Sequence, residues 1–162
     1  MWDNRGTLSN CRRLLMRIDF ASRPPAFATG AKRPKGGRAQ GISYEKKVQT
    51  HFDSVEGYLP GPWIEMDVGG RPSYAQPDGV HFDLKAMKIR IIEVKLKHCV
   101  EARAQLTRYK SLISSMFPGW PIHLIEVVKW LDPDVKGFGP YQLCPDPFTY
   151  EGDTPGVHIL RL

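Results

Sequence analysis

The sequence predicts an α/β domain in which a helix, three strands, a second helix and a fourth strand follow one another, α-β-β-β-α-β. Two observations predict this class. Stretches with apolar residues at helical spacing alternate with shorter stretches of strand-like character, and Gly or Pro separates them. The chain has 162 residues, of which 41% are hydrophobic and 25% are charged, which suits one domain with a sizeable core and additional extensions. We expect this core over residues 42–131.

The elements of the core follow from hydrophobic period and from the positions of Gly and Pro. The expected helices cover residues 42–55 and 100–117, and the expected strands cover 63–68, 73–84, 89–96 and 121–131. Ser43 is a suitable N-cap for the first helix. Beyond residue 131, Pro, Gly and aromatic residues follow without a period. This predicts an extension over 132–162 that packs on the core and ends in a short strand at 157–162.

Residues 1–41 are expected to form a basic helix and arm outside the core. Apolar residues at near-helical spacing predict a short amphipathic helix at 8–20, and Pro and Gly without a period predict a linker at 21–41. Nine Lys and Arg against two Asp fall in this region, whereas the rest of the chain is close to neutral. Such an arm suits a polyanion. The candidate nucleic-acid contacts are Arg12, Arg13, Arg17, Lys32, Arg33, Lys35 and Arg38. A mitochondrial transit peptide is the alternative.

Two consecutive expected strands bring acidic and basic side chains to one place. In the strand at 89–96, Glu93 and Lys95 share a face because a strand has a period of two, and the residues between them form an apolar opposite face. Asp78 begins the preceding strand, so we expect it beside them. Charged groups on a buried strand are unfavourable unless they have partners. Two carboxylates and a lysine would suit a hard metal ion next to a cation.

The order Pro77-Asp78, then Glu93-Val94-Lys95, resembles the signature of the PD-(D/E)XK nuclease superfamily. Its restriction-enzyme, RecB-like and lambda-exonuclease-like members cut phosphodiester bonds with magnesium. The resemblance covers residues 42–131 and includes the order of the elements. It implies a restriction-endonuclease-like fold with a mixed central sheet flanked by helices. The two other Pro-Asp pairs of the chain lack an acid-x-Lys on a following strand.

The resemblance also implies a role for each residue of the motif. Asp78, Glu93 and the Val94 carbonyl would hold Mg²⁺ or Mn²⁺, and Lys95 would orient the attacking water. Glu45 lies on the first expected helix, where many members of the superfamily have another acidic residue near the metal. The structural alternative is an ion pair of Glu93 and Lys95 on a solvated strand, with Glu45 as an ordinary exposed helix residue.

A further part of the resemblance lies on the second expected helix. Gln105 and Tyr109 are four residues apart and therefore share one helix face. Gln-x-x-x-Tyr at this position resembles the RecB-like branch, in which the pair would contact Lys95 or the scissile phosphate. The alternative is a polar residue followed by a core tyrosine.

We therefore expect a Mg²⁺-dependent deoxyribonuclease that hydrolyses phosphodiester bonds with low sequence specificity, since no helix suited to reading a DNA groove is identifiable. Two other classes stay open. One is a non-catalytic component of a phage particle or complex that retains the nuclease fold and serves a structural or DNA-binding role. The other is a module that binds nucleic acid by charge alone, with Asp78 and Glu93 as structural residues.

Cysteine content and hydropathy restrict the location. The three cysteines are widely spaced and form no CxxC, which argues against a disulfide framework and favours a reducing compartment. No apolar run approaches about 18 residues, so no membrane span is expected. A small nuclease of this kind suits the cytoplasm of a bacterium or of a phage-infected host, with association with a virion as an alternative. Besides DNA, a protein partner or a second copy of the chain could order the arm.

Overall fold

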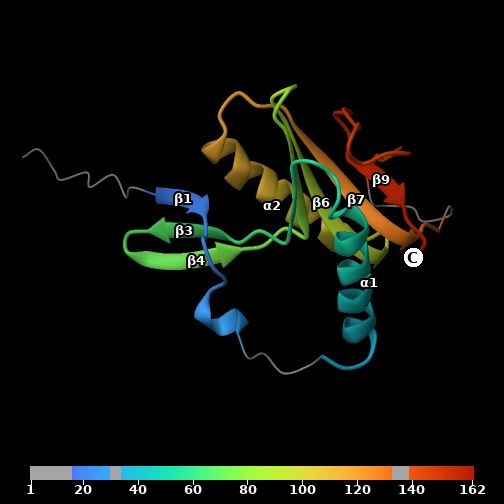
Figure 1. Ribbon diagram of the computed structural model, residues 1–162, viewed down its shortest axis with the longest axis horizontal. Helices are drawn as coiled ribbons and strands as arrows, with labels where there is room; N and C mark the ends of the chain where they lie inside the picture. Colours follow the sequence, from blue (N-terminus) through green and yellow to red (C-terminus); the bar gives the residue numbers. More distant parts are fainter. Residues whose placement is uncertain (1–15, 30–33, 133–138) are drawn as a thin grey trace, which may run out of the picture.

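The computed structural model describes residues 16–29, 34–132 and 139–162, and these form two sheets flanked by helices (Figure 1). The helices are η1 (Ala26–Ala28, 3₁₀), α1 (Gly37–Phe52) and α2 (Val100–Met116). The strands are β1 (Met16–Phe20), β2 (Tyr58–Pro60), β3 (Ile64–Val68), β4 (Arg71–Ala75), β5 (Gly79–Asp83), β6 (Lys88–Lys97), β7 (Ile122–Trp130), β8 (Gln142–Leu143) and β9 (Gly156–Ile159). The α/β class predicted from the sequence is confirmed.

The main sheet has six strands in the order β2-β5-β6-β7-β9-β8. It is mixed, because β2, β5 and β6 pair antiparallel whereas β7 runs parallel to β6 and β9 runs parallel to β7. A parallel pair needs a crossover connection, and α2 supplies it between β6 and β7. Helices α1 and α2 pack on opposite faces of this sheet (Figure 1). Strand β6 is therefore buried on both faces, which explains its long apolar sequence.

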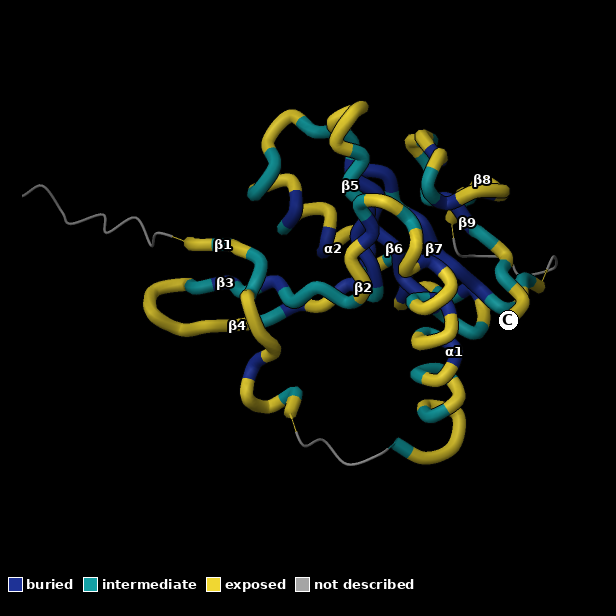
Figure 2. Tube along the Cα trace, viewed as in Figure 1, coloured by how far each residue is buried: buried dark blue, intermediate teal, exposed yellow. Residues whose placement is uncertain are grey.

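Alternate side chains of β6 belong to two apolar clusters, one on each face of the main sheet. Ile92 and Val94 pack in the cluster that contains α1, and Ile91 packs in the cluster that contains α2. Glu93 and Lys95 continue the row of Ile91, because side chains alternate along a strand. Figure 2 shows β6 and β7 buried through the middle of the molecule. Along the end of β6, Glu93 is still buried, Lys95 is half-buried and Lys97 is exposed.

A three-stranded antiparallel sheet, β1-β3-β4, projects from the side of the main sheet (Figure 1). Ile18 and Phe20 of β1 pack against the cluster that contains α2. The prediction of a helix over 8–20 is therefore wrong for residues 16–20. Met16, Ile18 and Phe20 fit a period of two. Hydrogen-bonded pairing with β3 favours the strand over the helix for these residues. Residues 8–15 of the predicted helix lie outside the described residues.

Other boundaries also differ from the prediction. Helix α1 begins at Gly37 and not at residue 42, so the expected border between arm and core falls inside the helix. The expected strand at 73–84 is two strands in different sheets, β4 and β5. The chain crosses between the sheets at Gln76-Pro77-Asp78, where Pro77 has no N–H to donate to a ladder. Strands β2 and β8 were not predicted, because they are too short to show a period.

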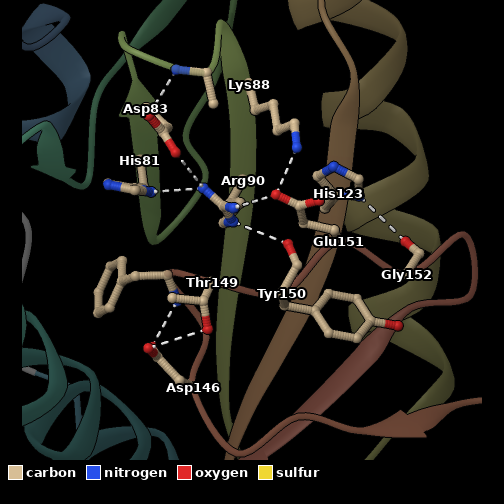
Figure 3. A network of polar contacts seen from close by, with 12 residues as sticks. His81, Asp83, Lys88, Arg90, His123, Asp146, Thr149, Tyr150, Glu151 and Gly152 are labelled. Atoms are coloured by element: carbon tan, nitrogen blue, oxygen red, sulfur yellow. Dashed lines mark hydrogen bonds and ion pairs between the residues drawn. The ribbon is translucent and has the colours of Figure 1, made fainter.

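The C-terminal region adds β8 and β9 to the edge of the main sheet, and a buried arginine fixes it there (Figure 3). Arg90 of β6 is only 1% exposed. Its Nε donates a hydrogen bond to the Tyr150 carbonyl at 2.9 Å, and its Nη1 and Nη2 lie 3.6 Å from Asp83 Oδ2 and Glu151 Oε1. Nη1 also lies 3.4 Å from His81 Nδ1. The guanidinium group thus joins β5, β6 and the C-terminal region.

Replacing this arginine is expected to destabilise the protein even when the charge is kept. Arg90→Lys removes the fork that reaches a carbonyl and two carboxylates, so we expect a loss of about 2–3 kcal/mol in the free energy of unfolding. Urea unfolding followed by tryptophan fluorescence measures it. Arg108→Lys, at an exposed position of α2, is the control and should change stability by less than about 0.5 kcal/mol. Coinciding unfolding curves for the two variants would contradict the prediction.

Candidate active site

The residues of the Pro-Asp and Glu-Val-Lys motifs lie together where the two sheets meet. Asp78 stands between β4 and β5, and its Oδ2 accepts a hydrogen bond from the Val94 backbone N–H at 2.7 Å. Lys95 Nζ lies 2.6 Å from Glu93 Oε1. The antiparallel pairing of β5 with β6 produces this proximity, because Gly79 is the register partner of Ile92. Asp78 is therefore opposite Glu93 and Val94, as the sequence led us to expect.

Helix α1 brings a third carboxylate to the same place. Gln49 Nε2 donates hydrogen bonds to Glu45 Oε1 at 3.1 Å and to the Asp78 carbonyl at 3.0 Å. Glu45 and Gln49 are one helical turn apart and share a face. Gln49 was not identified from the sequence, although its spacing of four from Glu45 was a usable signal. The amide fixes both the orientation of Glu45 and the backbone at Asp78.

Burial and mutual repulsion perturb the acidic groups of the site. Burial raises the pKa of Glu45 to about 7, and the charge of Asp78 adds to the effect. Burial and the charge of Asp78 likewise raise the pKa of Glu93 to about 7. The pKa of Asp78 is also raised by burial, against the opposing effects of the Val94 N–H and Lys95. Near neutral pH, Glu45 and Glu93 are therefore close to their titration midpoints. Full ionisation of these neighbouring carboxylates is unfavourable without further positive charge.

Lys95 is the cation that faces these carboxylates. Burial alone would lower the pKa of Lys95, but the hydrogen bond and charge of Glu93, together with the charge of Asp78, outweigh it and raise the pKa. Lys95 therefore stays protonated at neutral pH. Its side chain is 28% exposed, whereas that of Glu93 is 2% exposed. The ammonium group lies at the boundary between the buried carboxylate and solvent.

The donor atoms of the site are hard oxygens, which Mg²⁺ and Mn²⁺ prefer. Within the described residues, Glu93 Oε2 is buried and has no hydrogen-bond partner. An orphaned carboxylate oxygen beside Asp78 fits a divalent cation, which would complete its coordination and relieve the repulsion. No group of three or more His, Cys, Asp or Glu side chains in the described part of the chain is arranged to hold a metal by itself. A cation here would therefore also need main-chain oxygen or water, such as the Val94 carbonyl.

Tyr109 of α2 contacts the chain just before Asp78, and Gln105 contacts Tyr109. The Tyr109 hydroxyl donates a hydrogen bond to the Gln76 carbonyl at 2.9 Å. Burial raises the pKa of Tyr109, and the charges of Glu93 and Asp78 add to this effect, whereas a hydrogen bond with Gln105 opposes it. The tyrosine is thus both a core residue and a support for the segment that carries Asp78.

A buried His–Glu pair beside the site was not assigned from the sequence. Glu126 of β7 is the register partner of Glu93 and is fully buried. Its Oε2 lies 2.5 Å from His98 Nδ1, and its Oε1 accepts a hydrogen bond from the Cys99 N–H at 3.1 Å. Cys99 is the N-cap residue of α2. The available signal was a glutamate in the middle of a mostly apolar strand, since a carboxylate needs partners when buried.

This pair should contribute strongly to stability. Glu126→Gln keeps one oxygen for the Cys99 N–H but removes the charge that faces His98, so we expect a loss of about 3 kcal/mol. Thermal unfolding measures it, with Glu101→Gln on the exposed face of α2 as the matched control. A Glu126→Gln variant as stable as the control would mean that the buried pair is energetically neutral.

The predicted nucleic-acid contacts are only partly within the described residues. Arg17 lies on β1, where its Nη2 is 3.4 Å from Asp19 Oδ2 and both side chains are exposed. Lys35 and Arg38 are exposed around the start of α1. Arg12, Arg13, Lys32 and Arg33 lie outside the described residues. Arg17 is therefore part of a sheet rather than of a free arm.

In the described ranges, no helix has the length and apolar character needed to cross a membrane.

No family model matches the chain, and no curated protein matches it. A search of solved structures found the crystal structure of protein VC1899 from Vibrio cholerae. The alignment covers 60% of this chain and 23% of that protein, at 19% identity and a TM-score of 0.35. This chain thus spans less than a quarter of the length of that structural relative.

Proposed function

We propose that this protein is a metal-dependent nuclease that hydrolyses phosphodiester bonds of DNA at the site formed by Glu45, Asp78, Glu93 and Lys95. One observation carries the proposal: three carboxylates with raised pKa values converge beside Lys95, and one buried oxygen of Glu93 has no partner among the described residues. A structural ion pair would need one carboxylate and would leave no orphaned oxygen. Groups perturbed in this way are concentrated at functional sites.

The lysine would act on the attacking water and on the phosphate. Hydrolysis needs a deprotonated water and stabilisation of the negative charge that develops on the phosphate oxygens. Lys95 Nζ is fixed by Glu93 and is partly exposed, so a substrate can reach it. Its ammonium group would orient the water, favour its deprotonated form and offset charge in the transition state. Mg²⁺ or Mn²⁺, held by Asp78, Glu93 and the Val94 carbonyl, would supply further charge neutralisation at the phosphate.

Glu45 and the residues around it would complete the site. With a pKa of about 7, Glu45 exists in both protonation states near neutral pH, which suits a group that accepts and returns protons. It could take the proton of the attacking water, or it could complete the metal shell as the resemblance implies. Gln49 holds its carboxylate and the Asp78 carbonyl. Tyr109, through the Gln76 carbonyl, would keep Asp78 aligned with β6.

The test is cleavage by the pure protein of supercoiled plasmid, linear duplex and circular single-stranded DNA, each with Mg²⁺, Mn²⁺ or EDTA. We expect cleavage with either metal and none with EDTA. Breakage of the circular substrates would indicate an endonuclease, and loss of the linear duplex alone an exonuclease. Asp78→Asn should be inactive, whereas Asp153→Asn, at an exposed position outside the site, should keep full activity. No cleavage with any metal would contradict the proposal and favour a structural or binding role.

A further inference from the structure

A basic groove runs along the side of α1 that faces away from Glu45. Two pockets form it, and they share Ser43, Lys47 and Leu162. One pocket, of about 480 Å³, extends to the ends of β6 and β7, and the other, of about 620 Å³, extends along α1 to His51. The helix residues of the groove recur every three or four positions, so they form one stripe, exposed along most of its length (Figure 2). They are Ala39, Gln40, Ser43, Tyr44, Lys46, Lys47, Thr50 and His51.

The charged side chains that line the groove are all basic. Its lining side chains include Lys46, Lys47 and Lys129, with His51 at one end, and none of the described residues that line it is Asp or Glu. Lys46 and Lys47 are exposed on the helix. The acidic residues of α1 and β6, Glu45 and Glu93, belong to the candidate active site on another face. A concave surface that is lined by several cationic side chains and by no Asp or Glu side chain of the described residues favours a polyanion.

The floor of the groove is apolar and includes an exposed aromatic ring. Trp130, the last residue of β7, is 46% exposed, and Lys129 Nζ lies 4.8 Å from the centre of its ring. Leu96 and Leu162 line the same pocket. Bases of a single strand can stack on such a ring, whereas a duplex hides its bases and offers chiefly phosphates. The combination of an aromatic floor with lysines on the rim is the composition of sites that bind single strands.

The groove and the candidate active site are lined by neighbouring residues of β6 and of α1, which point to different faces. Leu96 lines the groove and directly follows Lys95, whose side chain points to the other face of the sheet. Tyr44 lines the groove and directly precedes Glu45. From Ala39 to His51 the stripe extends about 18 Å along the helix, at about 1.5 Å per residue. That length matches roughly five nucleotides of a stacked strand, at about 3.4 Å for each phosphate.

We propose that this groove binds a single-stranded segment of nucleic acid and leads it around the end of β6 to Lys95. The inference rests on the proposed function, because it makes a single strand the substrate that the nuclease site receives. The phosphates contact Lys46, Lys47 and Lys129, and a base stacks on Trp130. The groove therefore gives the enzyme a preference for single strands, or for duplexes with a single-stranded end, over intact duplex.

The test is binding of fluorescein-labelled oligo(dT)₁₂ in EDTA, measured by fluorescence anisotropy with the full-length chain. Lys47→Glu/Lys129→Glu should weaken binding at least tenfold. The matched control, Lys85→Glu/Lys110→Glu, makes the same change in net charge at exposed lysines outside the groove and should weaken it less than threefold. Trp130→Ala should weaken binding of oligo(dT)₁₂ at least fivefold and binding of a 12-base-pair duplex less than twofold.

Two results would overturn the inference. One is an equal loss in the groove variant and in its control, which would mean that only net charge matters. The other is no binding of oligo(dT)₁₂ by the wild type. Because EDTA removes cleavage from the measurement, the two proposals can fail separately. A protein that binds oligo(dT)₁₂ through the groove but cuts no DNA with Mg²⁺ or Mn²⁺ would keep the groove and refute the nuclease. A protein that cuts DNA with Mg²⁺ or Mn²⁺, but whose binding of oligo(dT)₁₂ is unchanged in the groove variant, would keep the nuclease and refute the groove.

Discussion

Lys95→Ala is expected to lose at least about 10²-fold in the rate of metal-dependent DNA cleavage. Lys95 is the cation that lies 2.6 Å from Glu93 and faces solvent at the site, so its removal takes away the group that would orient the water and offset charge on the phosphate. The helices and sheets should be retained, because most of the core lies elsewhere along β6. Initial rates of plasmid nicking with Mg²⁺ and Mn²⁺ measure the loss, and circular dichroism tests folding.

The control for this prediction is Lys85→Ala. Lys85 is exposed in the turn between β5 and β6, at the opposite end of these strands from the site, and should be dispensable for cleavage. Full cleavage by a folded Lys95→Ala variant would exclude Lys95 from the reaction. Equal loss in both variants would point to nonspecific binding of DNA by surface charge.

Glu45→Gln is expected to make the metal-free protein more stable at pH 8 while lowering its cleavage rate. The pKa of Glu45 is raised from 4.5 to about 7 by burial and by Asp78. The folded state therefore binds the proton more tightly than the unfolded state does. The resulting stabilisation is complete below about pH 4.5 and is lost as the pH rises through about 7. At pH 8 the ionised carboxylate opposes folding, and the neutral amide removes that penalty.

The expected gain at pH 8 is about 1–2 kcal/mol, after allowance for the solvent exposure of Glu45, or a few degrees in Tm. Thermal unfolding in EDTA measures it. The gap between Glu45→Gln and wild type should close at pH 4.5. Glu101→Gln, at an exposed position of α2, is the matched control and should change stability by less than about 0.5 kcal/mol. A Glu45→Gln variant less stable than wild type at pH 8 would show that the carboxylate has a partner that offsets its burial.

The sequence predicted the long elements of the core better than the short ones. Helix α2 and strands β3, β6 and β7 fall close to their expected positions, because each has enough residues to show a period. Helix α1 overlaps its expected range but begins five residues earlier. Strand β1 was expected as the end of a helix, since Ile18 also fits the near-helical spacing of Leu8, Cys11, Leu14 and Leu15. What decides between the two is the partner strand β3, which lies more than 40 residues further along the chain and which local spacing cannot reveal.

The candidate site was predictable where it depends on alternation along one strand and less so where it depends on packing between elements. The shared face of Glu93 and Lys95 follows from the period of β6, and the position of Asp78 follows from the adjoining antiparallel strand. Gln49 was missed although its spacing of four from Glu45 was visible, and its second partner, the Asp78 carbonyl, lies outside α1. The buried Glu126 was missed because its partners, His98 and the Cys99 N–H, lie outside β7. The Tyr109 hydroxyl contacts the Gln76 carbonyl, a contact that only the crossing of the chain between two sheets creates.

The most direct test of the central claim, that the acidic cluster is a metal site, is calorimetric titration of Mn²⁺ into the protein at pH 6.5 in two buffers of different ionisation enthalpy. Glu45 and Glu93 have pKa values of about 7, so both are partly protonated there. We expect binding of Mn²⁺ with release of protons, and loss of that binding in Asp78→Asn. Binding of the same strength in Asp78→Asn, or no heat with the wild type, would contradict the claim.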